Sequence, residues 1–588
     1  MSLFFRRDHR QPSAEAIAAP TGGDLVLGYL ASTWASRHGK IERLQRFFSR
    51  PALPLLVLWA MVLAYTVLML QQVFYRYGMM EYNLGWLGWD LAIFDQATWL
   101  ISRGQTPFVT VRGLHILGDH FSVFLYLLAP FYWLWDSARV LLVAQTLALA
   151  LGAPLVYALA RERLESVWWG VLFAGVYLLY PTLHWANIYE MHPDTFAVPL
   201  LLGAVVCLRR SNWKLYFLCL LGVAFTKENA GLTICALGAW VWWSVNRRVG
   251  RLTLLGGILA VVVALGTIRH FNNNTSSGYY LLYARYGNSV PEVGLGILRR
   301  PGAVWEDVTS NRGREYLGHM MRPMMYLPLL SPGVFVAAVP ALLTNLLSSR
   351  IWMRDLRSGY YSSLIIPLLL IASIESCRRL RRIAGRRGMA LVGANLAVWT
   401  LLDVPQSPLW KGGREVPWFS FTPAHILSGR KRAAEAMIRR VPPQASVTAQ
   451  AQLLSYMSHR KQIYTFPNPF LERAWGNTLK ARRELEVFGG YNKRPPRLQA
   501  EVDAAKVEYV ALLPRTGTFP ITQSNFEDYL LALLKSPSYG IVFMDGHGIL
   551  FHRGAPRRAG WQLLAKAAGT RVSNEKQMEA AFWTWMAL

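Results

Sequence analysis

The chain has 588 residues, of which 53% are hydrophobic and 16% charged, and its apolar residues fall in runs too long for a soluble globular protein. The formal net charge of +28 would suit a nucleic-acid-binding protein, but the Lys and Arg residues gather in short segments between apolar runs, as in the cytoplasmic loops of membrane proteins. We therefore expect a polytopic membrane protein whose partner is the lipid bilayer and not nucleic acid. The four cysteines lie inside apolar runs without paired spacing, which disfavours a disulfide framework and a cysteine zinc site.

Residues 1–50 are basic and contain no signal-peptide apolar core, which predicts a cytoplasmic N-terminal segment. The run from Pro51 to about Val73 is the first predicted span and leads to a first external loop at residues 76–118. Interpreting residues 120–135 as re-entrant or surface-lying places every later basic cluster in the cytoplasm and gives about eleven crossings. The further spans are predicted near residues 140–160, 166–180, 195–208, 213–226, 230–245, 252–268, 316–330, 333–347, 361–376 and 389–402.

From about Asp403 the composition becomes that of a soluble domain. Strands are predicted at residues 445–450, 461–466 and 507–513 and in a hairpin within 539–553, and helices at 452–458, 525–535 and 574–588. The predicted fold is therefore mainly α. A transmembrane helical bundle covers residues 51–404, and a small α/β domain on the external side covers residues 405–588.

The stretch 89–103, WDLAIFDQATWLISR, is too short and too charged to span a bilayer, so it should lie along the membrane surface. Asp90 is the predicted N-cap of a helix that starts at Leu91, and Asp95 projects from the body of that helix. A partly desolvated carboxylate at either position would suit proton abstraction from a hydroxyl. The structural alternatives are a simple cap for Asp90 and a solvated charge for Asp95.

Two histidines and two acids lie within residues 184–194, HWANIYEMHPD. Because Pro193 breaks any continuous helix, the ligand spacing follows no template. Glu190 and Asp194 are candidate ligands of a divalent cation such as Mg or Mn. Alternatively, Glu190 and His192 hydrogen-bond to substrate or phosphate, and Asp194 caps the helix that follows.

Lys227 and Glu228 interrupt an apolar region that would be ~50 Å long as one helix, against a hydrocarbon core of ~30 Å. A charge at the bilayer centre is costly, so the chain should turn here, outside the membrane. The pair either neutralises itself or provides a lysine, held by its acid, that stabilises a phosphate leaving group.

Further candidates lie on the predicted external side. Arg350, Arg354 and Arg357, with Tyr360 and Tyr361, form a cationic and aromatic cluster that would suit a lipid phosphate, although ordinary loop charge is the alternative. His120 precedes an apolar run and is either a substrate contact or an interfacial histidine beside a helix cap.

With the segments WDLAIFDQATW, GDHFS, ANIYEMHPD, FTKENAG and VPPQASVTAQAQLLSYMSHRKQIYTFP, the chain resembles a family of bacterial polytopic membrane proteins considered distant relatives of the GT-C glycosyltransferases. The resemblance implies a GT-C-like fold, interfacial helices bearing an essential acid, and a sugar donor carried on polyprenyl phosphate. Asp90 and Asp95 match the acidic motif of the first loop, His192 and Asp194 the His-Pro-acid motif, and Lys227-Glu228 the Lys-Glu pair. Tyr360-Tyr361 stands where a His-Tyr pair is expected, which argues against a catalytic histidine there.

The leading hypothesis is a glycosyltransferase that moves a sugar from a polyprenyl-phosphate donor to an unidentified acceptor at the outer face of a bacterial cytoplasmic membrane. Asp95 or Asp90 would be the base, and Lys227, His192 and Arg354 would hold the phosphate. A transporter or flippase of a lipid-linked or acidic solute, and a non-catalytic envelope assembly protein, are the alternatives.

Overall fold

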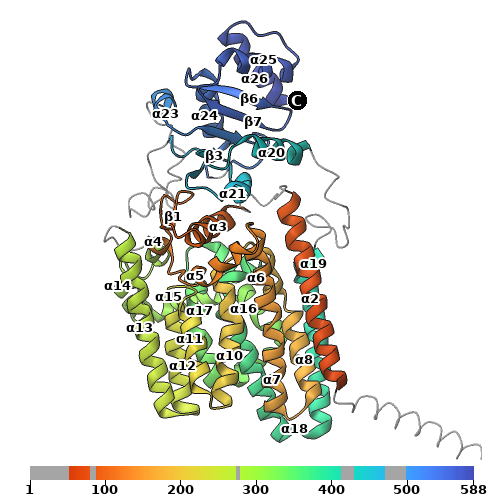
Figure 1. Ribbon diagram of the computed structural model, residues 1–588. Helices are drawn as coiled ribbons and strands as arrows, with labels where there is room; N and C mark the ends of the chain where they lie inside the picture. Colours follow the sequence, from red (N-terminus) through yellow and green to blue (C-terminus); the bar gives the residue numbers. More distant parts are fainter. Residues whose placement is uncertain (1–51, 80–87, 273–277, 412–428, 471–497, 519) are drawn as a thin grey trace, which may run out of the picture. The chain divides into compact units, whose positions relative to one another are not determined.

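The computed structural model describes residues 52–79, 88–272, 278–411, 429–470, 498–518 and 520–588. The predicted cytoplasmic segment 1–50 therefore lies outside the described residues. The first part of the chain is almost entirely helical, and the last part holds a β-sheet (Figure 1). The α-helices up to the first long gap in the second half are α2 (Ala52–Met79), α3 (Trp89–Ser102), α4 (Ile116–Asp119), α5 (Leu125–Leu128), α6 (Arg139–Ala150), α7 (Gly152–Leu164), α8 (Val167–Leu178), α9 (Pro181–Ile188), α10 (Ala197–Arg209), α11 (Trp213–Ala224), α12 (Ala230–Ser244), α13 (Arg247–Phe271), α14 (Val290–Arg299), α15 (Pro301–Thr309), α16 (Asn311–Met321), α17 (Pro332–Leu346), α18 (Ile366–Asp403) and α19 (Pro408–Lys411).

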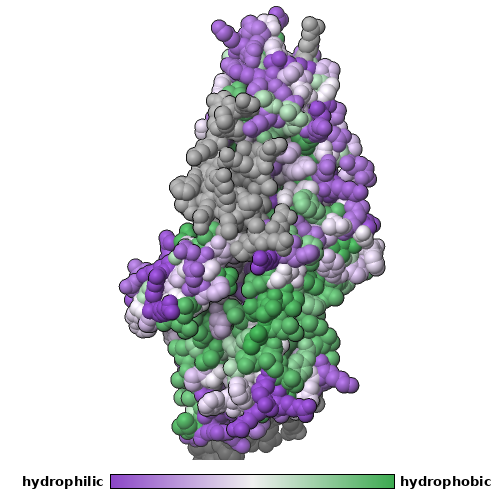
Figure 2. Space-filling model, turned by 90° about the vertical axis from the view of Figure 1, so that its left-hand side faces the viewer, coloured by the Kyte–Doolittle hydropathy of each residue, from purple (hydrophilic) through white to green (hydrophobic). Residues whose placement is uncertain are grey.

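Four helical stretches are long and apolar enough to cross a membrane: α2, the continuous pair α6 and α7, α13, and α18. The pair α8 and α9, bent by 48°, makes a fifth if it counts as one span, and α11, α12 and α17 are shorter apolar helices. These numbers apply to the described residues, and the predicted total of about eleven crossings stays a prediction. Figure 2 shows a band of hydrophobic side chains across the face that it views, with hydrophilic side chains on both sides of the band.

Several predicted boundaries are found in the structure. The chain breaks between α11 and α12, so the expected turn at Lys227 to Asn229 is confirmed. Residues 120–135 form only α5 and the short 3₁₀ helix η1 (Ala129–Trp133), which are too short to cross a bilayer as a helix. Helix α18 contains a break at Gly385, with φ of 60°, and so consists of two helical segments, as predicted.

The basic ends of three helices meet on one buried carboxylate. Glu375 in α18 accepts hydrogen bonds from Arg163 of α7 at 2.6 Å, from Arg209 of α10 at 3.0 Å and from Arg378 at 2.9 Å. Three of the basic clusters that were predicted to share one side of the membrane, at residues 161–163, 209–210 and 378–387, are therefore together in space. Three cations around one anion also leave a net positive charge at this end of the bundle.

The last part of the chain contains a five-stranded mixed sheet in the order β4-β3-β5-β7-β6. Strands β4, β3 and β5 are parallel, and β7 pairs antiparallel with both β5 and β6. All five strands and the hairpin fall where the sequence predicted them, whereas helices α20, α23 and α25 were not predicted. The elements are α20 (Gly429–Arg440), β3 (Val447–Ala449), α21 (Ala451–Met457), β4 (Ile463–Thr465), α23 (Leu498–Ala504), β5 (Tyr509–Leu512), α24 (Gln523–Lys535), β6 (Tyr539–Met544), β7 (Ile549–Arg553), α25 (Arg557–Ala568) and α26 (Glu575–Ala587).

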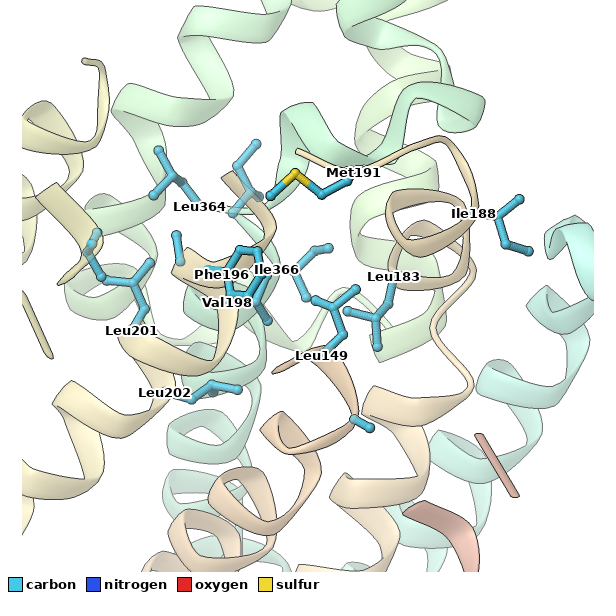
Figure 3. Close-up of a cluster of buried hydrophobic side chains, with 14 of the residues drawn as sticks. Leu149, Leu183, Ile188, Met191, Phe196, Val198, Leu201, Leu202, Leu364 and Ile366 are labelled. Atoms are coloured by element: carbon cyan, nitrogen blue, oxygen red, sulfur yellow. The ribbon is translucent and has the colours of Figure 1, made fainter. Parts of the chain in front are cut away.

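The helical core includes the segment between α9 and α10. Met191, Phe196 and Leu201 belong to the same cluster of buried side chains as Leu364 and Ile366 (Figure 3). Because Met191 is fully buried in this cluster, its neighbours in sequence are fixed against the core. The short 3₁₀ helix η2 (Pro193–Phe196) then leads into α10.

Candidate active site

A cavity of about 1020 Å³ lies between α3, the 189–194 segment, the 227–229 turn, α17 and the segment between α17 and α18. One part of its wall is polar and aromatic, and the other part is apolar. The apolar part comes from α12, α13, α14 and α17 and includes Leu232, Val261, Leu265, Val293, Ile297 and Leu343. The polar part includes Asp90, Asp119, His120, His192, Asp194, Lys227, Glu228, Arg350 and Tyr361.

Asp90 lines the cavity from the first turn of α3, but it is not the N-cap of that helix. The N-cap is Gly88, whose left-handed φ of 105° favours glycine, and no side chain of the cap residue bonds to the helix. The cap is instead supplied by Glu190, whose carboxylate accepts hydrogen bonds from the Gly88 amide at 2.7 Å and the Leu91 amide at 2.5 Å. This leaves the Asp90 carboxylate, with 23% of the side chain exposed, directed to His192, whose Nε2 is 3.4 Å away.

His192 is held between Asp90 and an aromatic ring. Its imidazole stacks on Tyr360 with 3.6 Å between ring centroids and 15° between planes. Gly359 allows the segment before α18 to pack closely on α9, since a Cβ there would lie 2.4 Å from the Thr182 carbonyl oxygen. The Nδ1 atom of His192 is buried and has no hydrogen-bond partner among the described residues. Among the described residues, the polar partner of this imidazole is therefore Asp90, through Nε2.

Lys227 pairs with Asp194 and not with its sequence neighbour Glu228. Its Nζ lies 2.6 Å from the Asp194 carboxylate and over the rings of Tyr361 and Tyr360, at 5.3 and 5.9 Å from their centroids. Burial opposes the charged form, but Asp194 and Glu228 outweigh it and raise the pKa of Lys227, so the ammonium is retained. The predicted helix cap by Asp194 is wrong, because its carboxylate is committed to this pair.

Glu228 contacts His120 instead. The distance from the His120 Nδ1 to the Glu228 carboxylate is 3.1 Å, and the Tyr279 hydroxyl lies 2.8 Å from the other ring nitrogen of His120. Burial alone would raise the pKa of Glu228, but the charge and hydrogen bond of His120, together with Lys227, lower it to about 2. Asp119 beside them forms a bidentate pair with Arg112, with both distances 2.8 Å.

The residues suggested for a metal do not gather into a ligand set. Glu190 caps α3, whereas Asp194 binds Lys227, so the two carboxylates have different partners. Among the described residues, no three His, Cys, Asp or Glu side chains converge as metal ligands would. Burial and the nearby Asp90 also raise the pKa of Glu190 well above its ordinary value, which disfavours the charged form that a cation needs.

Only part of the predicted arginine cluster lines the cavity. Arg350, Arg357, Tyr360 and Tyr361 line the cavity. Arg354 does not, and its guanidinium donates to the Ser348 carbonyl at 3.3 Å. Three lining arginines were missed: Arg76 at the end of α2, Arg112, and Arg269 at the end of α13. Each of them ends or follows an apolar run, which is the only signal that the sequence carries for them.

Asp95 does not line the cavity. It is completely buried, accepts hydrogen bonds from the hydroxyls of Tyr132 and Ser458, and faces Nε2 of His459 at 3.2 Å. Ser458 and His459 follow α21, so Asp95 connects α3 to the part of the chain that contains the sheet. Of the two candidate bases, only Asp90 lines the cavity. We therefore prefer Asp90 to Asp95 as the base.

The contact of His459 with Asp95 is expected to weaken as the pH rises. His459 lies between Asp95 and Asp136, and although burial lowers its pKa, these two carboxylates raise it above the ordinary value. A group with a raised pKa stabilises the folded state fully below its unfolded pKa of about 6.5, and the contribution is lost as pH rises through the folded value. The Tm of the protein in detergent should fall more steeply above neutral pH than that of His459→Gln. Identical pH profiles would contradict this role.

Comparison with known proteins gives three results. No curated protein matches the chain significantly. The chain aligns with the crystal structure of ArnT from Cupriavidus metallidurans bound to undecaprenyl phosphate at 14% identity and a TM-score of 0.44, over 85% of this chain and 98% of that one. Residues 81–480 match the family described as "Predicted membrane protein (DUF2079)". This match covers more than half of the sequence, and the chain belongs to the DUF2079 family of predicted membrane proteins.

Proposed function

We propose that the protein is a membrane-embedded glycosyltransferase of the GT-C type that transfers a sugar from a polyprenyl-phosphate donor to an acceptor hydroxyl. The observation that carries the proposal is the cavity, which joins an apolar wall to a polar end where a carboxylate, Asp90, lies among cations. A ligand that fits both parts is an amphiphile with a long apolar tail and an anionic head. Residues 51–404 would form the membrane domain and residues 405–588 an extracytoplasmic domain at the outer face of a bacterial cytoplasmic membrane.

Asp90 is the proposed general base. Four carboxylates of described residues line the cavity, and three of them are paired: Asp119 with Arg112, Asp194 with Lys227 and Glu228 with His120. The fourth, Asp90, has only the longer contact with Nε2 of His192, at 3.4 Å, as an ion pair among the described residues. A carboxylate without a strong cationic partner is the one that can accept a proton from an acceptor hydroxyl.

The cations would stabilise the leaving group. As the acceptor oxygen forms a bond to the anomeric carbon, the bond from that carbon to the phosphate oxygen breaks, and its electron pair stays on the phosphate. The proton of the acceptor hydroxyl passes to Asp90. Lys227, Arg350 and His192 are the groups that would hold the phosphate, since all three residues line the cavity. Attack from the side opposite the leaving group inverts the anomeric configuration.

The test is incubation of the purified protein with a panel of polyprenyl-phosphate sugars and candidate acceptors. Release of free polyprenyl phosphate that depends on an acceptor, with Asp90→Asn as the negative control, is the expected result. Movement of the lipid-linked sugar across proteoliposomes without release of free lipid phosphate would overturn the proposal and favour a flippase. Absence of both turnover and movement would favour a non-catalytic role.

A further inference from the structure

Glu190 is buried and does not line the cavity, yet it touches the helix that carries Asp90. Its two carboxylate oxygens accept from the amides of Gly88 and Leu91, which lie on either side of Asp90 in the sequence. The first amides of a helix have no partner within the helix, and α3 has no side-chain cap of its own. Glu190 therefore fixes the first turn of α3 from a distant part of the chain.

The segment that carries Glu190 is itself held rigidly. Gln145 in α6 donates to the Glu190 carbonyl at 2.8 Å and accepts from the His192 amide at 2.8 Å. Met191, between them, is buried in the hydrophobic core cluster (Figure 3). The backbone on both sides of Met191 is thus fixed by one glutamine, while its side chain is fixed by packing.

The same short segment contacts Asp90 from two directions. Glu190 holds the backbone around Asp90, and His192, two residues later, faces the Asp90 carboxylate at 3.4 Å and stacks on Tyr360. A shift of α3 would change the distance from Asp90 to His192 and the direction of the Asp90 carboxylate together. Gly88 has little freedom to absorb such a shift, since even a Cβ there would lie 3.2 Å from the Ala451 carbonyl oxygen of α21.

We propose that Glu190 is a positioning residue that holds the first turn of α3 so that Asp90 points at the acceptor hydroxyl. This inference rests on the proposed function of the cavity, because it assigns Glu190 a part in the same reaction. Glu190 does not touch substrate. Its effect is on the geometry of the base, so it should alter turnover and not donor binding.

The test compares Glu190→Ala and Glu190→Gln with Glu508→Ala as a matched control. Glu508 also accepts a hydrogen bond from a backbone amide, that of Ser446 at 2.7 Å, but it lies in the sheet part and outside the cavity. For Glu190→Ala we expect faster hydrogen exchange in residues 88–94 and a fall in kcat of about 10²-fold, as for a small misplacement of a reacting group, with the donor KM unchanged. Glu190→Gln should recover part of kcat, because its amide oxygen still accepts from one of the two amides.

The outcomes separate the inference from the proposed function. A wild-type protein without transferase activity would overturn the proposed function itself. An active wild type whose Glu190→Ala and Glu190→Gln variants both keep the wild-type kcat would overturn the inference, as would a rise in donor KM with kcat unchanged. If Glu190→Ala does not fold, Glu190→Gln alone is the test. A lower kcat with an unchanged donor KM supports the inference, and a raised donor KM with an unchanged kcat overturns it. Glu508→Ala should change neither kcat nor exchange in residues 88–94.

Discussion

Asp90→Asn is expected to lower the kcat of sugar transfer by about 10²–10⁴-fold, the range that general base catalysis contributes. Asparagine has nearly the same shape but cannot take a proton from the acceptor hydroxyl. The stability of the fold should change little, because the Asp90 side chain is 23% exposed and the α3 cap is supplied by Glu190. Initial rates of polyprenyl phosphate release and the Tm in detergent, measured on the same preparations, check both parts.

Asp95→Asn is the matched control, because the two acids share a helix but not an environment. Asp95 is fully buried and accepts from Tyr132 and Ser458 beside His459, and a hydrogen bond to a charged group contributes about 1.5–3 kcal/mol. The Tm should fall, whereas transfer per folded molecule should be retained. A stable, inactive Asp95→Asn protein alongside an active Asp90→Asn protein would contradict the assignment and make Asp95 the base.

The sequence predicted local structure well, since that structure depends on near neighbours. The alternation and turn residues of 539–553 specify the β6–β7 hairpin, and the charged pair at Lys227 and Glu228 breaks the apolar region between α11 and α12. The helix within 89–103 was recognised for the same reason, because its charges and length exclude a span, although most of its residues are buried within the protein. These features require no knowledge of what lies across the fold.

The site depends on partners that lie far apart in the sequence, and there the predictions failed. Asp90 and Asp95 are equivalent candidates until Ser458 and His459 are found next to Asp95. The cap of α3 comes from Glu190, about a hundred residues away, so a local rule assigned it to Asp90. Sequence adjacency paired Lys227 with Glu228, although a charged side chain in a turn reaches whichever opposite charge the fold brings near it.

Lys227→Met is expected to destabilise the fold strongly. The Lys227 and Asp194 side chains are 15% and 10% exposed, so removing the ammonium leaves a carboxylate that is nearly buried and unpaired. Breaking one partner of a buried pair typically costs about 3–5 kcal/mol. Lys535→Met provides the control, because its pair with Glu579 is 38% and 36% exposed and surface pairs contribute about 0–1 kcal/mol. The Tm of both variants in detergent measures the difference.

The double variant Lys227→Met with Asp194→Asn separates the structural role of the pair from its role in transfer. Asparagine removes the unpaired charge, so much of the lost stability should return. Sugar transfer should stay lost, because the ammonium that would stabilise the departing phosphate is still missing and methionine has no charge to replace it. Recovery of transfer together with stability would show that Lys227 only neutralises Asp194, and the phosphate would then have to be held by Arg350 and His192 without it.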